Sequence, residues 1–378
     1  MQILSFFALP SLLACGVAAV PSQQQAELAF DALQGWYNES IGLWIPSTGW
    51  WNSANCLTVI ADLAEINPDV ATKAEAIYPN TWSNAQDYNL QLQKTVAAPE
   101  FLMQSQHGGN LPKHKTTGFL NNYYDDEGWW ALAWIAVYDV TGDRKYLRTA
   151  ESIFDDMAKA YGTTPCGGLW WSKDRTYVNA IANELFLDVA AHLANRAGAK
   201  KSYYLDFAKK EWAWFKQSGM INSQNLINDG LDNATCQNNG GTVWSYNQGV
   251  VLGGLTELSR ATGDDSYVVK GKLIADAAIQ NLTDSNGILH DPCEPDCGAD
   301  GSQFKGVFAR NLQILQQYSP EPRYATFLEK NANSIWKYDR SRRGNKLSLI
   351  WSGPFVKPAN ASTQSSAMDV LVAALATQ

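Results

Sequence analysis

Hydrophobic and polar positions divide this chain into two kinds of segment that alternate along it. In one kind, apolar residues recur on a single face with helical spacing, and in the other nearly every position is apolar, as in a helix buried on all sides. We expect amphipathic helices at residues 25–40, 84–106, 143–161, 202–218, 266–282 and 323–338. We expect buried helices at residues 53–66, 126–141, 181–197, 248–262, 306–318 and 366–377.

The connections between these segments are also of two kinds. The connection after each buried helix is short, and two of them, at 141–143 and 262–264, have the sequence Thr-Gly-Asp. Glycine there suits a helix end, and aspartate suits the next helix start. The connections after the amphipathic helices are longer and rich in Gly, Asn and Trp.

Recurring helix pairs of this kind favour an all-α (α/α)6 barrel, with the six buried helices inside and the six amphipathic helices outside. An open superhelix of the same pairs is the alternative. In the closed barrel, the long loops gather at one end, around the starts of the inner helices. We find no low-complexity run or proline-rich hinge, so we expect residues 20–378 to form a single domain.

Residues 1–19 have the pattern of a secretory signal, with an apolar stretch at 3–13 followed by small residues. No later segment is long enough to span a bilayer, and we interpret the apolar C-terminal segment as a barrel helix rather than a lipid-anchor signal. Four glycosylation sequons agree with a secreted, extracellular or cell-wall-associated protein: Asn38, Asn233, Asn281 and Asn360.

Composition narrows the possible partners. The net charge of -8 provides no basic surface for nucleic acid or anionic lipid. The chain carries 15 Trp and 16 Tyr, whose rings suit sugar faces as well as a protein core. Four histidines show no catalytic or metal-ligand spacing, so we expect no metal and no cofactor: His107, His114, His192 and His290. We also expect a monomer.

Cysteine usage predicts two disulfides and one free thiol. Cys15 lies in the signal, which leaves an odd number of cysteines in the mature chain. Cys293 and Cys297 are close enough to close a small loop, and we then expect Cys166 to pair with Cys236. Cys56 lies in an apolar pattern and is expected to be a buried free thiol.

One stretch combines carboxylates with aromatic residues at the start of a buried helix. Residues 121–130 read Asn-Asn-Tyr-Tyr-Asp-Asp-Glu-Gly-Trp-Trp, so that Asp125, Asp126 and Glu127 lie beside a dry interior. Placing carboxylates there is costly, and acid–base catalysis needs such a site because it separates the pKa values of neighbouring groups. The alternative is that they are first-turn acids favoured by the helix dipole, and we interpret Glu127 in this way.

Asp125 and Asp126 are adjacent, so they converge on one ligand only if they begin a helix. Adjacent residues suit the roughly 5–5.5 Å carboxyl separation of retaining glycosidases better than the roughly 6.5–9.5 Å of inverting ones. Spacing alone does not decide between the two.

The stretch Tyr-Tyr-Asp-Asp-Glu-Gly-Trp-Trp-Ala-Leu-Ala-Trp resembles the signature of glycoside hydrolase family 76, which contains endo-α-1,6-mannanases and fungal cell-wall proteins of the Dfg5/Dcw1 type. Supporting stretches lie at 49–55, 246–249 and 304–306, together with Arg310. The resemblance implies an (α/α)6 barrel acting on α-1,6-linked mannose with retention. It also implies Asp125 as the nucleophile and Asp126 as the general acid/base.

Other residues are candidates for contacts with the sugar. Aromatic candidates are Trp51, Tyr124, Trp129, Trp130 and Trp171, with core packing as the alternative. Polar candidates near inner-helix starts are Asn55, Asn183, Tyr246, Asn247 and Gln248, with helix capping as the alternative. Arg310 either holds Asp125 ionised, binds substrate or forms a structural ion pair.

The main hypothesis is a secreted, retaining endo-α-1,6-mannanase of the mannan endo-1,6-α-mannosidase type, hydrolysing mannan through a covalent glycosyl-enzyme intermediate. One alternative is a transglycosylase of the same family that moves mannose-containing glycans, such as anchor glycans, into the cell wall. The other is a non-catalytic glycan-binding barrel. An intact Asp125-Asp126 pair argues against a simple binder, which has no need for two carboxylates at one point.

Overall fold

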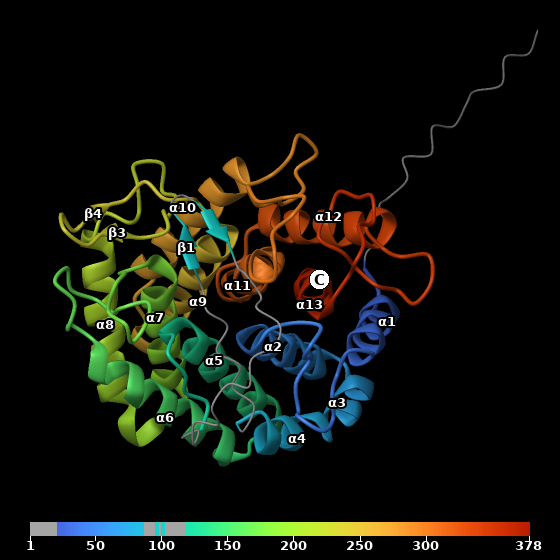
Figure 1. Ribbon diagram of the computed structural model, residues 1–378, viewed down its shortest axis with the longest axis horizontal. Helices are drawn as coiled ribbons and strands as arrows, with labels where there is room; N and C mark the ends of the chain where they lie inside the picture. The colour runs from blue at the N-terminus through green and yellow to red at the C-terminus, as the bar shows by residue number, and fades with distance from the viewer. Residues whose placement is uncertain (1–20, 87–94, 98–99, 103–117) are drawn as a thin grey trace, which may run out of the picture.

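The chain folds into a closed ring of helix pairs. The structure is a computed structural model that describes residues 21–86, 95–97, 100–102 and 118–378 (Figure 1). The inner helices are α2 (Trp50–Ile66), α5 (Tyr124–Thr141), α7 (Ala180–Arg196), α9 (Ser245–Thr262), α11 (Phe304–Tyr318) and α13 (Ala361–Ala376). The outer helices are α1 (Gln23–Gln34), α3 (Pro68–Ala74), α4 (Ile77–Asn84), α6 (Arg144–Ala160), α8 (Lys201–Gln217), α10 (Ser266–Asn281) and α12 (Pro322–Tyr338).

Each inner helix packs against the next, and the last, α13, packs against both α11 and α2. Figure 1 shows the ring from α2 round to α13, with the outer helices surrounding it. This closure confirms the (α/α)6 barrel and excludes the open superhelix.

The signal segment at 1–19, His107 and His114 lie outside the described residues.

The inner helices are buried almost throughout, as their composition predicts, and glycines let them approach closely. At Gly249, a Cβ atom would lie 2.6 Å from the Phe308 Cα, so only glycine allows α9 to pack on α11 at this distance. The outer helices bury one face, as in α6, where Tyr146, Ile153 and Phe154 point inward.

Both Thr-Gly-Asp junctions form as predicted. Gly142 and Gly263 end α5 and α9 in the left-handed conformation, with φ of 68° and 74°. Asp143 caps α6 by accepting a hydrogen bond from the Lys145 N–H at 2.9 Å. These short connections reverse the chain from an inner helix to the outer helix that covers it.

The predicted helix at 84–106 is wrong. Helix α4 ends at Asn84, and the backbone of β1 (Thr95–Ala97) pairs antiparallel with β2 (Glu100–Leu102). The outer layer here consists of α3 and α4, because Asn67-Pro68 both ends α2 and starts α3. Asn67 Oδ1 accepts hydrogen bonds from two α3 amides, and proline is well suited to the first helical turn.

The disulfide predictions are confirmed. Cys166 pairs with Cys236, Cys293 pairs with Cys297, and Cys56 is a buried free thiol. None of the helices in the described ranges is long and apolar enough to cross a membrane.

The loops that precede the inner helices form one end of the barrel. They are tied to one another by backbone hydrogen bonds: the Tyr124 N–H donates to the Trp171 carbonyl at 3.0 Å, and the Ala180 N–H donates to the Asp229 carbonyl at 2.7 Å. A second short ladder, β3 (Leu231–Asp232) with β4 (Gln237–Asn238), lies within the loop before α9. We call this end of the molecule the loop end.

Candidate active site

The adjacent aspartates lie in the first turn of α5, at the loop end. Their helix begins at Tyr124, whose amide is bound by the loop before α7, so the first turn faces that loop. Both carboxylates are buried, with Asp125 7% and Asp126 5% exposed. A carboxylate in the first turn of a helix is stabilised by the helix dipole, which offsets part of the cost of this burial.

The two aspartates have different hydrogen-bond donors. Asp125 Oδ2 accepts a hydrogen bond from the Trp171 indole N–H at 3.1 Å. Asp126 Oδ2 accepts one from the Asn121 side-chain amide at 2.6 Å, and Asn121 Oδ1 in turn accepts the Tyr123 N–H at 2.8 Å. Separate donors hold the two carboxyl groups in separate orientations, as a pair with two chemical roles requires.

Glu127, the next residue after this pair, links two loops through its carboxylate. It is fully buried, and its Oε1 accepts hydrogen bonds from the Asn121 N–H at 3.0 Å and from Lys173 Nζ at 2.8 Å. Lys173 also pairs with Asp156 at 2.8 Å. Burial raises the pKa of Glu127 to about 8, although Lys173 opposes this shift. Glu127 therefore joins two loops and fixes Asn121, the donor to Asp126.

A third carboxylate, Asp229, lies close to Asp125. It is buried, and its Oδ2 accepts a hydrogen bond from the Tyr177 hydroxyl at 2.5 Å. Burial raises the pKa of Asp229 to about 6, and the Asp125 charge contributes to this rise. Sequence reasoning missed Asp229, although its setting in a loop rich in Asn and Gly before α9 was a usable signal.

Tyr246 lies among these acids at the start of α9. Its ring stacks on Phe304 with centroids 3.7 Å apart. Burial raises the pKa of the Tyr246 hydroxyl, and the charges of Asp229, Asp125, Glu184 and Asp300 raise it further. Carboxylates from α5, from α7 and from the loops before α9 and α11 therefore all lie near enough to the Tyr246 hydroxyl to raise its pKa.

Two tryptophans form an aromatic pair beside the acids. Trp51 and Trp129 stack with centroids 5.7 Å apart and an interplanar angle of 27°. The Trp51 indole N–H donates to Asp300 Oδ1 at 2.7 Å. Asp300 follows the loop closed by the Cys293–Cys297 disulfide, and a Cβ on its neighbour Gly301 would lie 3.0 Å from the Cys297 Cβ. The disulfide loop therefore positions the acceptor that orients Trp51.

The other aromatic candidates lie in two settings. Trp171 packs on Tyr123, with ring centroids 5.1 Å apart, and donates a hydrogen bond to Asp125. Tyr124 is buried, and Lys173 Nζ lies 5.4 Å from its ring centroid. Trp130, in contrast, is fully buried and packs on Trp50 and Trp134 in the barrel wall. The packing of Trp130 matches the core alternative.

Two polar candidates hold loops in place. Asn183 accepts the Leu169 N–H at 2.6 Å and donates to the Leu169 carbonyl at 3.0 Å. Gln248 makes the same two-way contact with the Ile227 backbone at 2.8 and 2.9 Å. These side chains attach the loops before α7 and α9 to the inner helices.

The remaining candidates lie inside the barrel. Arg310 donates to Asn55 Oδ1 at 2.6 Å and pairs with Asp369 at 3.2 Å, so the structural ion pair is the alternative that the geometry matches. Asn247 is fully buried, and its amide atoms have no hydrogen-bond partner among the described residues. Groups of three or more potential metal ligands do not occur in the described part of the chain.

Comparison with known proteins gives one family. The family model described as glycosyl hydrolase family 76 matches residues 22–378. Mannan endo-1,6-alpha-mannosidase DFG5 of Candida albicans is 24% identical over 320 residues, covering 80% of this chain and 66% of that protein. A putative mannan endo-1,6-alpha-mannosidase of Schizosaccharomyces pombe is 29% identical over 213 residues, covering 52% of this chain and 48% of that protein. The chain thus spans about half to two thirds of these relatives' length.

Solved structures share the fold. The GH76A alpha-1,6-mannanase of Salegentibacter has a TM-score of 0.75 at 19% identity, covering 94% of this chain and 99% of that one. A variant of it with two consecutive aspartates changed to asparagine is described as inactive and was crystallised with alpha-1,6-mannotriose. Dfg5 from Chaetomium thermophilum, in complex with glucosamine, has a TM-score of 0.75 at 20% identity, covering 96% and 92% of the two chains.

Proposed function

This chain belongs to glycosyl hydrolase family 76, and from that premise we propose that it is a secreted, retaining endo-α-1,6-mannanase acting on mannan backbones. One observation carries the proposal: Asp125 and Asp126 begin an inner helix at the loop end, buried, each with its own hydrogen-bond donor. The related mannanase whose consecutive aspartates were replaced is described as inactive, which supports assigning chemistry to such a pair.

Asp125 is the proposed nucleophile. The Trp171 indole N–H donates to Asp125 Oδ2 and so fixes the orientation of the attacking carboxylate. In the first step an Asp125 oxygen bonds to the anomeric carbon, the glycosidic carbon–oxygen bond breaks, and the Asp126 proton passes to the departing oxygen. Asp126 is therefore the proposed general acid.

The second step reverses these roles. A water molecule attacks the anomeric carbon and gives its proton to Asp126, and the bond to Asp125 breaks. Two displacements at one carbon return the starting α configuration. Asn121, which is held by Glu127, fixes the orientation of Asp126 through both steps.

The surroundings of the pair support a sugar substrate. The Trp51–Trp129 pair offers aromatic surface beside the acids, and Asp229 and Tyr246 offer polar groups for sugar hydroxyls. Specificity for α-1,6-mannan is proposed because the relatives are mannan endo-1,6-alpha-mannosidases. Secretion is proposed from residues 1–19, the four sequons and the two disulfides, which form in oxidising compartments.

The test is digestion of linear α-1,6-mannan, with the products sized and their anomeric configuration followed by NMR. We expect short oligomers that appear first as the α-anomer, and loss of turnover in Asp125→Asn and Asp126→Asn. Asp206→Asn, at an exposed α8 position, is the matched control and should behave as wild type. Products longer than the starting oligomers would identify a transglycosylase. Binding of mannan without any product would identify a glycan-binding barrel.

A further inference from the structure

One short segment of this chain is strongly basic, although the net charge is -8. Five of the ten residues at 337–346 are cationic: Lys337, Arg340, Arg342, Arg343 and Lys346. We call residues 337–346 the basic segment. It begins at the end of α12 and continues into a tight turn, in which the Ser341 N–H donates to the Lys346 carbonyl at 2.8 Å. The turn holds the five positive charges close together.

The charge of the basic segment is not compensated within the protein. None of its five cations forms an ion pair with a carboxylate of the described residues. Its one acid, Asp339, is fully buried, and the carboxylate accepts hydrogen bonds from the Ser348 N–H at 3.0 Å and from the Ser348 hydroxyl. Four of the cations are exposed to solvent: Lys337, Arg342, Arg343 and Lys346.

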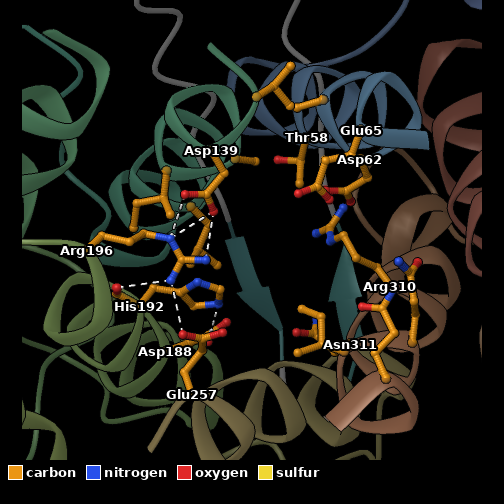
Figure 2. A pocket seen from close by; sticks show the side chains of 18 of the residues that line it. Thr58, Asp62, Glu65, Asp139, Asp188, His192, Arg196, Glu257, Arg310 and Asn311 are labelled. Carbon is orange, nitrogen blue, oxygen red and sulfur yellow. Dashed lines mark hydrogen bonds and ion pairs between the residues drawn. The ribbon is translucent and has the colours of Figure 1, made fainter. Parts of the chain in front are cut away.

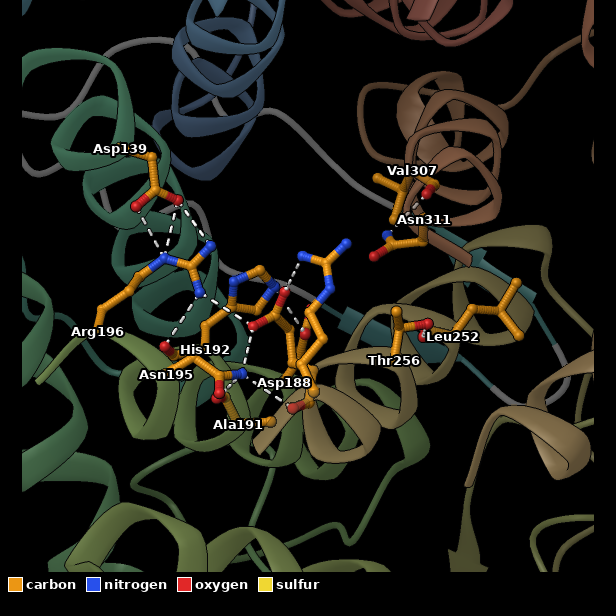
Figure 3. A network of polar contacts seen from close by, with 12 residues as sticks. Asp139, Asp188, Ala191, His192, Asn195, Arg196, Leu252, Thr256, Val307 and Asn311 are labelled. Atoms are coloured by element: carbon orange, nitrogen blue, oxygen red, sulfur yellow. Dashed lines mark hydrogen bonds and ion pairs between the residues drawn. The ribbon is translucent and has the colours of Figure 1, made fainter. Parts of the chain in front are cut away.

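Arginines inside the barrel, in contrast, are matched by carboxylates. At the end opposite the loop end, Arg196 pairs with Asp139 at 2.7 Å and with Glu257 at 3.0 Å (Figure 3). Arg310 lies on the facing wall of the cavity there (Figure 2) and pairs with Asp369 at 3.2 Å. Like charges that are crowded together without such partners repel one another, and a bound anion removes this repulsion.

Two of the cations are fixed on aromatic rings rather than by acids. The Arg340 guanidinium carbon lies 4.4 Å from the Trp336 ring centroid, and Lys346 Nζ lies 4.9 Å from the Trp36 ring centroid. Arg340 also donates to Asn345 Oδ1 at 2.8 Å. Contact with a ring orients a cation without neutralising it. Because the side chains are ordered beforehand, an anion that binds them incurs a smaller entropy cost.

The side chains of the basic segment suit a sugar that carries phosphate. A guanidinium group presents paired N–H groups that match two phosphate oxygens, and the segment contains three such groups. Tyr338, in the same segment, is 51% exposed. An exposed aromatic ring offers a surface to the face of a sugar.

The basic segment lies at the rim of the loop end. The residues that follow it are attached to the starts of two inner helices. The Leu347 N–H donates to Gln364 Oε1 on α13 at 2.8 Å, and the Leu349 carbonyl accepts a hydrogen bond from Lys305 Nζ on α11 at 2.7 Å. A polymer that enters the loop end can therefore reach these cations.

We propose that the basic segment binds phosphodiester groups carried by the polysaccharide on which the loop end acts. The identity of that polymer as mannan rests on the proposed function, whereas the contact with phosphate requires no catalysis. A membrane is a poorer fit, because the other large hydrophobic side chains exposed among the described residues lie on α8 and α10 and provide no apolar anchor here. Nucleic acid is a poorer fit, because one short segment does not make a basic face.

The test is calorimetric titration of the full chain carrying Asp125→Asn and Asp126→Asn, so that no polymer is cut. The probes are α-1,6-mannan that carries phosphodiester groups and the same mannan without phosphate. We expect the phosphorylated mannan to bind about tenfold more tightly, since several exposed ion pairs of modest strength act together. This preference should disappear at about 1 M salt, where the Debye length is ~3 Å. It should also disappear when Arg342→Gln, Arg343→Gln and Lys346→Gln are combined.

A matched control removes the same charge elsewhere. Lys201→Gln, Lys209→Gln and Lys216→Gln change exposed positions on α8, which lies across the ring from α12 (Figure 1), and this combination should keep the preference. Wild-type hydrolysis of phosphate-free mannan tests the proposed function separately.

Four results would overturn the proposal. They are equal binding of the two mannans, an unchanged preference in the variant of the basic segment, an equal loss of preference in the α8 variant, and binding of a different anionic partner as tightly as phosphorylated mannan. Polygalacturonate, which carries carboxylates, and phosphatidylserine vesicles are the probes for the last of these.

Discussion

Replacing Glu184 by glutamine should stabilise the folded protein progressively as the pH rises. Glu184 is fully buried in α7, and neither of its carboxyl oxygens has a hydrogen-bond partner among the described residues. Burial raises the pKa of Glu184 well above 4.5, and the nearby Asp229 and Asp188 charges add to the rise. The folded state therefore holds the Glu184 proton more tightly than the unfolded chain does.

The sign and size of the effect follow from proton linkage. A group with a raised folded-state pKa contributes stability below its unfolded pKa, and this stability is lost as the pH rises toward the folded pKa. Each pH unit in that window is worth up to ~1.4 kcal/mol. Between pH 5 and pH 7, wild type should lose up to ~2.7 kcal/mol relative to Glu184→Gln, which carries no proton to lose.

Urea unfolding of both proteins at pH 5, 6 and 7 measures this difference. Glu75→Gln, at an exposed position beyond α3, is the matched control and should show no trend with pH. Titration of the other buried acids occurs in both proteins and largely cancels in the difference. A stability difference that is independent of pH, or that shrinks as the pH rises, would refute the assignment of Glu184 as a buried neutral acid.

Two further changes test contacts around the candidate site. Asp300→Ala removes the acceptor that orients Trp51. A hydrogen bond to a charged group contributes roughly 1.5–3 kcal/mol. We therefore expect KM for mannan oligomers to rise about tenfold, with kcat nearly unchanged. Initial-rate kinetics measures this, and an unchanged KM would contradict a role for Asp300 in positioning Trp51. Lys173→Met removes the cation beside Glu127, whose pKa of about 8 leaves it only half ionised at pH 8, so we expect the free energy of unfolding to fall by less than ~1 kcal/mol at pH 8 and by more toward pH 9. The loss should shrink toward pH 5, where Glu127 is protonated, and a loss that is equal at pH 5 and pH 9 would contradict this account.

Much of the architecture was predictable because the inner and outer layers of the barrel differ in their patterns of hydrophobic residues. Inner helices such as α7 are buried on every side and therefore lack a polar face, whereas outer helices such as α6 keep one. The prediction failed at 84–106 for a local reason. Asn67-Pro68 is compatible with a helix end and with a helix start, and only the packing of α3 and α4 against the ring selects both.

The candidate site was predictable only where it is local in sequence. Asp125 and Asp126 are adjacent, so their shared helix start could be inferred from the apolar run that follows. Asp229 and Asp300 reach the same end from the loops before α9 and α11, and no spacing rule connects residues so far apart along the chain. The partners of Arg310 could not be predicted either, because Asn55 on α2 and Asp369 on α13 come close to it only when the ring of helices closes.

Mass spectrometry of the enzyme with an activated fluorinated mannosyl substrate decides whether Asp125 is the nucleophile of a retaining reaction. We expect one covalent glycosyl adduct that maps to the peptide containing Asp125, is absent in Asp125→Asn, and persists longer in Asp126→Ala because the base for the second step is missing. An active enzyme that forms no adduct and releases β-configured product would contradict the assignment of Asp125 as nucleophile.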